Sequence, residues 1–147
     1  MTEPKTVTSN PWRFERKFFI DNLGFYNIEN EILLHPSCFK EVFPARQVNS
    51  IYLDTYSLKA LRDNVEGVAR RKKTRVRWYG ETIGYIKKPV LEHKIKQGFL
   101  GRKEHFHLPA FNLDQDCGYS EFVKVLENIE LPKWLRLELN CLKPKLF

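Results

Sequence analysis

The sequence has few cysteines, and none of them is placed as a metal or redox motif requires. Its three cysteines, Cys38, Cys117 and Cys141, are widely spaced and form no CxxC pair. This spacing argues against a structural zinc site. It predicts a reducing, cytoplasmic setting in which the cysteines are buried or idle.

Long apolar runs and glycine-rich phosphate loops are also missing. No apolar run approaches the length of a membrane-spanning helix, and the first ten residues are polar. The sequence therefore predicts no membrane segment and no secretory signal. It contains no P-loop and no GxGxxG motif. Any phosphate binding must come from side chains rather than from a backbone cradle.

The overall composition is that of a folded, basic chain. Of its 147 residues, 42% are hydrophobic and 14% aromatic, which predicts one folded domain over residues 12–147 after a flexible leader over residues 1–11. The formal net charge of +7 favours phosphates, nucleic acid or an anionic membrane surface as partners. Charge alone also fits a generic basic protein. No RNP-like or helix-turn-helix signature supports a specific nucleic-acid partner, and this possibility ranks last because the charged residues sort by strand face across distant segments.

The most basic segment of the chain also has the pattern of a strand. Six of the eight residues at positions 70–77 are basic, and none of the eight is acidic. The aromatic and β-branched residues that follow favour extended structure. Alternation along a strand places Arg75 and Arg77 on one face and Val76 and Trp78 on the other. The segment therefore predicts a surface for a polyanion, backed by an apolar face that can pack.

Two further predicted strands, Trp12–Ile20 and Val90–Lys96, also gather their charges on one face. Like charges brought this close are destabilising unless a multiply charged anion or water lies among them. The alternative is that each charged face is the solvent-exposed side of an antiparallel sheet. Carboxylates in such a group either hold lysines in place or bind a divalent metal. The residues concerned are Arg13, Glu15 and Lys17 in the first strand and Glu92, Lys94 and Lys96 in the second.

The rest of the chain predicts a mixture of strands and helices. Strands are predicted over Gln47–Asp54 and Arg102–Leu108, the latter as a hairpin partner of Val90–Lys96, with a polar turn region over Gly80–Lys88. Helix starts are predicted at Asn27, at Asp54 or Thr55, at Ser120 and at Pro132, and Pro36 either ends the first helix or opens a short one that buries Phe39, Val42 and Phe43. The segment after Pro132 also alternates like a strand. His93 is expected on the other face of its strand from Glu92, and His105 and His107 are expected at the surface.

Four motifs, in this order, resemble the VTC domain. This is the polyphosphate polymerase family within the triphosphate tunnel metalloenzymes, related to CYTH proteins. The motifs are Arg13–Phe18, Ser50–Thr55, Ala69–Gly80 and Leu91–Lys96, and the resemblance extends from about Trp12 to the end of the chain.

The resemblance implies an α+β fold, an antiparallel β-tunnel of the triphosphate tunnel type with flanking helices. The second half of the family's pattern, with a Tyr-x-Arg strand and a late acidic strand that holds the metal, is not found, so an incomplete half-tunnel is expected. Open sheet edges of that kind invite self-association.

The resemblance also implies an activity, in which the terminal phosphate of ATP is transferred to inorganic polyphosphate with Mn²⁺ or Mg²⁺. The main metal ligand is expected outside this chain. The alternatives are an inactive polyphosphate- or nucleotide-binding fragment and a tripolyphosphate hydrolase, although Arg13 replaces the first glutamate of the ExExK signature. By motif, the catalytic residues would be Arg75, Arg77 and Lys94, the phosphate-binding residues Lys17, Lys96, Lys103 and Arg13, and the weaker metal candidates Glu15 and Glu92.

Overall fold

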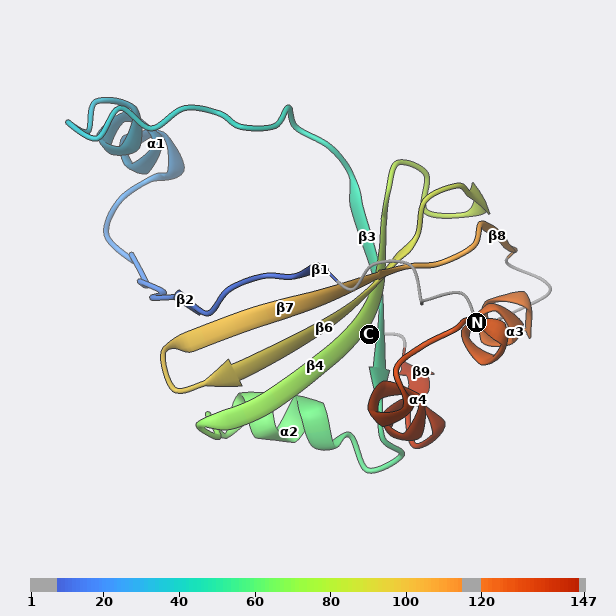
Figure 1. The fold of residues 1–147 in the computed structure, drawn as a ribbon. Coiled ribbons are helices and arrows are strands. Elements are labelled where there is room, and N and C mark those ends of the chain that lie inside the picture. Colours follow the sequence, from blue (N-terminus) through green and yellow to red (C-terminus); the bar gives the residue numbers. More distant parts are fainter. Residues whose placement is uncertain (1–7, 115–119, 146–147) are drawn as a thin grey trace. The chain divides into compact units, whose positions relative to one another are not determined.

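Two units make up the chain in the computed structural model, which describes residues 8–114 and 120–145. The larger unit comprises Met1–Glu15 and Gln47–Phe147, and the smaller unit comprises Arg16–Arg46. The larger unit contains an antiparallel sheet whose strands run in the order β1-β7-β6-β4-β3-β9, with β2 also paired to β7 (Figure 1). Its strands are β1 (Thr8–Ser9), β2 (Arg13–Phe14), β3 (Val48–Asp54), β4 (Arg70–Tyr79), β6 (Val90–Gln97), β7 (Leu100–His107) and β9 (Lys143–Lys145).

The sheet stays open within the described residues. Strand β9 forms one edge, and β1 with β2 forms the other. A small second sheet pairs β5 (Gly84–Ile86) with β8 (Phe111–Leu113), and the helices of this unit are α2 (Lys59–Val65), α3 (Ser120–Asn128) and α4 (Lys133–Asn140). The architecture is therefore α+β and antiparallel, with an open sheet of the kind expected for half a tunnel.

Alternation along the strands builds the hydrophobic core on one face of the sheet. Ile51, Val76, Leu91 and Phe106 lie opposite one another in four neighbouring strands, and each is at most 4% exposed. Helices α3 and α4 contribute the fully buried Phe122 and Leu135 to the same cluster. Burial of one such side chain stabilises the fold by about 1.5–3 kcal/mol.

The expected strand Trp12–Ile20 is largely wrong, because pairing in β2 covers only Arg13–Phe14. The reason lies in its partner. Phe14 pairs with Leu100, the first residue of β7, and the Glu15 N–H donates to the Phe99 carbonyl at 2.9 Å. Beyond that point β7 has already turned back toward β6, so residues 16–20 have no ladder in the described chain to join.

The other predicted strands are confirmed with small shifts at their ends, and the structure adds four short strands that the sequence did not predict. Strand β5 lies within the expected turn region, β8 follows the hairpin, and β9 contains Pro144. Proline has no N–H to donate, which a strand at the edge of a sheet tolerates. Thr8 and Ser9, in the expected leader, pair with β7.

In the smaller unit one predicted helix start shifts, and the first helix ends before Pro36, as one of the two alternatives predicted. Helix α1 (Phe25–Leu33) follows Gly24 rather than Asn27, and none of its residues is buried. The segment after Pro36 forms no helix, and its apolar residues Phe39, Val42 and Phe43 are exposed. Helices α3 and α4 start as predicted, at Ser120 and directly after Pro132.

Asp54 joins the end of β3 to the start of α2. Its carboxylate accepts hydrogen bonds from the N–H groups of Thr55, Ala60 and Leu61 at 2.7, 2.9 and 3.0 Å. The Thr55 hydroxyl accepts from the Lys59 N–H at 3.0 Å. The side chain of Asp54 thus satisfies N–H groups that the first turn of the helix leaves unpaired. The helix begins later than predicted, with Leu58 as its N-cap residue, but Asp54 and Thr55 do supply the acceptors for its first turn.

We expect Asp54→Ala to lower the free energy of unfolding by about 2 kcal/mol, because several N–H groups lose a charged acceptor in a buried position. Urea denaturation followed by circular dichroism measures the change. Asp63→Ala is the matched control, since it removes only the exposed i, i+4 ion pair with Lys59, which is worth about 0.5 kcal/mol. Equal losses in the two variants would contradict the capping role.

Candidate functional site: a charged face of the sheet

The face opposite the core carries most of the predicted site residues. The ladder places Arg75 opposite Glu92 and Glu92 opposite His105. Lys94 lies opposite Lys103 in the next pair of the same register. Three adjacent strands, β4, β6 and β7, therefore present their charges side by side. We call this surface the charged face; it comprises Tyr52, Arg75, Arg77, Glu92, Lys94, Lys96, Lys103 and His105.

Glu92 is the buried carboxylate at the centre of the charged face and is only 7% exposed. Its Oε2 accepts from Arg75 Nε at 2.8 Å and lies 2.6 Å from Arg75 Nη2, which is a forked contact. Its Oε1 lies 3.7 Å from Arg77 Nη1 and 3.6 Å from His105 Nε2. Arg75 Nη1 in turn donates to the Tyr52 hydroxyl at 3.1 Å. One carboxylate thereby contacts two arginines of β4 and a histidine of β7.

Burial and neighbouring charges shift three pKa values on this face. Burial alone would raise the pKa of Glu92, but Arg75, Arg77 and Lys103 together outweigh it and hold the pKa below the ordinary 4.5. Burial also lowers the pKa of Lys103, and the surrounding cations add to that effect against the charge of Glu92. The pKa of His105 is lowered by burial and by Lys103, again against Glu92. His105 is therefore neutral at pH 7.

A small cleft continues the charged face toward β2. Its volume is about 200 Å³, and it lies where Arg13 pairs with Gly101 of β7. Lys94 Nζ donates to Glu15 Oε2 at 2.8 Å across the cleft. The cleft therefore brings together predicted site residues from three separate segments of the sequence: Arg13 and Glu15, Lys94, and Lys103.

The two candidate metal ligands, Glu15 and Glu92, do not fit a divalent cation in the described structure. Each carboxylate accepts from a cation, Lys94 in the first case and Arg75 in the second. The part of the chain that the structure describes contains no group of three His, Cys, Asp or Glu residues placed to hold a metal ion. Both acidic residues act here as partners of basic side chains.

Two predicted phosphate-binding residues remain, Lys17 and Lys96. Lys17 belongs to the smaller unit and has an exposed side chain. Lys96 lies on the charged face, where its strand position is opposite Gly101. Of the cysteines, Cys38 and Cys141 are exposed rather than buried, and Cys117 lies outside the described residues.

Sequence reasoning missed two members of the charged face. His105 was expected at the surface, but it is half-buried and faces Glu92. Tyr52 lies within the motif Ser50–Thr55 but was not named as a site residue. Both follow from register, since Tyr52 pairs with Arg75 and His105 with Glu92. His93 lies on the opposite face as predicted, fully buried, with Nδ1 3.0 Å from the Thr74 hydroxyl.

We expect Glu92→Gln to lower the free energy of unfolding by about 3 kcal/mol at pH 7, because Arg75 loses its ionised partner in a nearly buried position. The folded-state pKa of Glu92 is depressed, so this stabilisation is present above about pH 4.5 and is lost as the pH falls through the folded-state value. The gap between wild type and variant should therefore shrink toward pH 3 in urea titrations. An unchanged gap, or an equal loss in the exposed control Glu121→Gln, would contradict this role.

Comparison with known proteins identifies the family. The VTC domain matches residues 12–130, which is about four fifths of the chain and includes every strand that contributes to the charged face. Comparisons with curated proteins and with solved structures gave no match. None of the helices in the described residues is long and apolar enough to cross a membrane. The extent of the family match shows that this chain belongs to the VTC domain family.

Proposed function

We propose that the charged face binds ATP and inorganic polyphosphate and transfers the terminal phosphate of ATP to the polyphosphate chain. The observation that carries the proposal is the register of β4, β6 and β7, which pairs Lys94 with Lys103 and places Arg75 on the same face, opposite Glu92. Membership of the VTC domain family supports a polyphosphate-related role.

The geometry of the charged face suits a long anion with repeated charge. Neighbouring strands lie about 5 Å apart, and alternate residues along one strand about 7 Å apart. Arg75 and Arg77 therefore form one row, and Lys94 with Lys103 extends the cations across the sheet. Guanidinium groups make forked contacts with phosphate oxygens, and ammonium groups act as point charges. A ligand that is a chain of phosphates can contact several of these basic groups at once. A ligand with a single carboxylate cannot.

The charged face keeps hydrogen-bonding capacity for a ligand. Arg77 Nε is buried without a hydrogen-bond partner in the structure, which is costly unless a ligand or water completes it. Glu92 holds Arg75 in place, so that its guanidinium loses less freedom when an anion binds. Lys94 has one carboxylate partner and is about a third exposed, so it can turn toward a phosphate.

Phosphoryl transfer needs positioning and neutralisation of charge rather than a covalent nucleophile. A terminal oxygen of polyphosphate forms the new bond to the γ-phosphorus of ATP, the bond to the β–γ bridging oxygen breaks, and ADP leaves. Arg75, Arg77 and Lys94 would stabilise the charge on the transferred group. VTC domains are generally metal-dependent, and a bound divalent cation would neutralise further charge; the described carboxylates do not fit one, so we assign it no residue here.

A binding-only function is the second candidate. One observation favours it, namely that Glu15 and Glu92 are both engaged by cations, which leaves neither as an open metal ligand. In this case the charged face would hold polyphosphate or a nucleotide without turning it over. A tripolyphosphate hydrolase is a weaker alternative, since Arg13 stands where the ExExK signature has its first glutamate.

Incubation of the purified protein with ATP and Mn²⁺ is expected to yield long-chain polyphosphate, detected by gel electrophoresis. Tripolyphosphate binding is measured in parallel by calorimetry. Arg75→Ala and Arg77→Ala should each weaken that binding by about tenfold to a hundredfold, because each removes a charge-assisted contact. Lys133→Ala, on the opposite side of the sheet, serves as the control and should bind like wild type.

The products separate the candidate functions. Binding that depends on Arg75 and Arg77 without any polyphosphate product would support the binding-only function. Orthophosphate released from tripolyphosphate would support the hydrolase. Tripolyphosphate affinity that is unchanged in both arginine variants would contradict the charged face as the binding site.

We also expect tripolyphosphate binding to strengthen as the pH falls below about 6.5, because His105 then gains a proton and adds a cation to the charged face. Burial depresses its pKa in the free protein below the ordinary 6.5, so the added affinity appears on the acidic side of that value. Calorimetry from pH 5 to pH 8 with wild type and His105→Asn isolates the histidine from protonation of the ligand itself. Identical pH profiles would contradict this contribution.

A further inference from the structure

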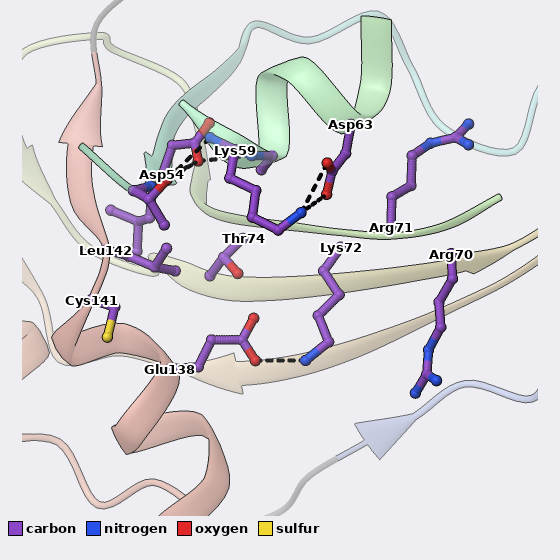
Figure 2. A pocket seen from close by; sticks show the side chains of 13 residues that line it. Asp54, Lys59, Asp63, Arg70, Arg71, Lys72, Thr74, Glu138, Cys141 and Leu142 are labelled. Atoms are coloured by element: carbon purple, nitrogen blue, oxygen red, sulfur yellow. Dashed lines mark hydrogen bonds and ion pairs between the residues drawn. The ribbon is translucent and has the colours of Figure 1, made fainter. Parts of the chain in front are cut away.

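A hollow of about 480 Å³ lies beside strand β4, and none of its lining residues belongs to the charged face (Figure 2). Helix α2, strand β4 and the C-terminal end of α4 border it. We call it the back pocket. Leu53, Thr74 and Leu142 contribute to its lining, and Cys141 lies at its edge with an exposed side chain. The lining of the back pocket is therefore largely apolar and lies next to a set of charged groups.

Two basic residues of the back pocket, Arg70 and Lys72, come from positions of β4 that the charged face does not use, and Lys59 comes from α2. Alternation sends Arg70 and Lys72 to the side of Thr74 and sends Arg75 to the opposite side. Figure 2 shows Arg70 and Lys72 projecting from β4 in the same direction. The basic run at positions 70–77 is thus divided between two faces of one strand.

Carboxylates only partly neutralise these cations. Lys59 Nζ lies 2.8 Å from Asp63 Oδ2, and Lys72 Nζ lies 2.8 Å from Glu138 Oε2. Arg70 lines the pocket and makes no ion pair among the described residues. Each ammonium group also has donors beyond those its carboxylate uses. The pocket can therefore accept one further negative group.

A simpler explanation of these charges is that β4 becomes polar where the helices no longer cover it. That explanation accounts for the charges but not for the hollow. Leu53 and Thr74 line the pocket, and yet each is only 3% exposed, so they lie at the bottom of a recess rather than on an open surface. A recess with an apolar floor and a charged rim is the usual form of a small-molecule site.

We propose that the back pocket is a second ligand site, which binds a small organic anion. The apolar body of the ligand would lie against Leu53 and Leu142, and its phosphate, sulfonate or carboxylate would contact Arg70 and Lys72. The volume lies within the range of about 300–1,000 Å³ typical of ligand pockets. It exceeds what a single inorganic anion fills, which is why the ligand needs an organic part.

The site is separate from the proposed polyphosphate site. Lys72 and Thr74 line the back pocket, whereas Arg75 and Arg77 belong to the other face of the same strand. Tripolyphosphate should therefore bind without displacing an anion from the back pocket, and loss of one site should leave the other in place.

The probe for the test is naphthalene-1-sulfonate, which combines an aromatic body with one anionic group. Cys141 is the reporter, in a protein carrying Cys38→Ser and Cys117→Ser. We expect saturating probe to slow alkylation of Cys141 by iodoacetamide at least threefold. In two-dimensional amide NMR the probe should shift the resonances of Ala60, Thr74 and Leu142. Excess tripolyphosphate should change neither result.

Arg70→Gln is expected to weaken binding of the probe at least fivefold, and Lys72→Gln should have the same effect. Lys124→Gln, an exposed lysine on α3, is the matched control and should leave binding unchanged. The amide spectrum reports whether each variant is folded, and Arg70→Gln alone suffices if Lys72→Gln is not. Unslowed alkylation, shifts confined to residues 16–46, full affinity in Arg70→Gln, or displacement by tripolyphosphate would each overturn the proposal.

Discussion

The forked contact between Glu92 and Arg75 is the interaction on which the charged face depends. Without a carboxylate at that point, arginines and lysines from three adjacent strands would face one another with no compensation in a half-buried setting. Glu92 lies 2.6 Å from Arg75 and within 4 Å of Arg77 and His105. It supplies less negative charge than the cations around it supply positive charge. This excess of positive charge is the property on which the proposed binding of a multiply charged anion rests.

The charged face also depends on the core behind it. Val76 and Leu91 are fully buried, and each lies next in sequence to a charged residue, Arg75 in one strand and Glu92 in the other. Packing of the apolar side chains therefore fixes the strand positions that set the spacing of the cations. The same alternation places Lys72 on the side of the back pocket, so one strand serves two surfaces of different chemistry.

The sequence was sufficient to predict much of this arrangement, because alternation is a local property. The charged pattern of β4 and β6 identified Arg75, Arg77 and Lys94 as residues of one face before their pairing was known. Pairing itself is not local. The early end of β2 depends on where β7 turns, and the position of His105 depends on which residue lies opposite Glu92. Strands of three residues such as β5 and β8 carry too few side chains for any pattern to predict them.

The alternation of β4 and β6 has a consequence for how the chain avoids misfolding. A shift of one residue in their pairing would turn every side chain of one strand to the other face. Arg75 would then enter the core, and Val76 would enter the charged surface. Burial of unpaired charge costs several kcal/mol for each group, so such a slipped sheet would be far less stable than the native one. The residues proposed to bind phosphate thereby also enforce the correct alignment of the strands that carry them.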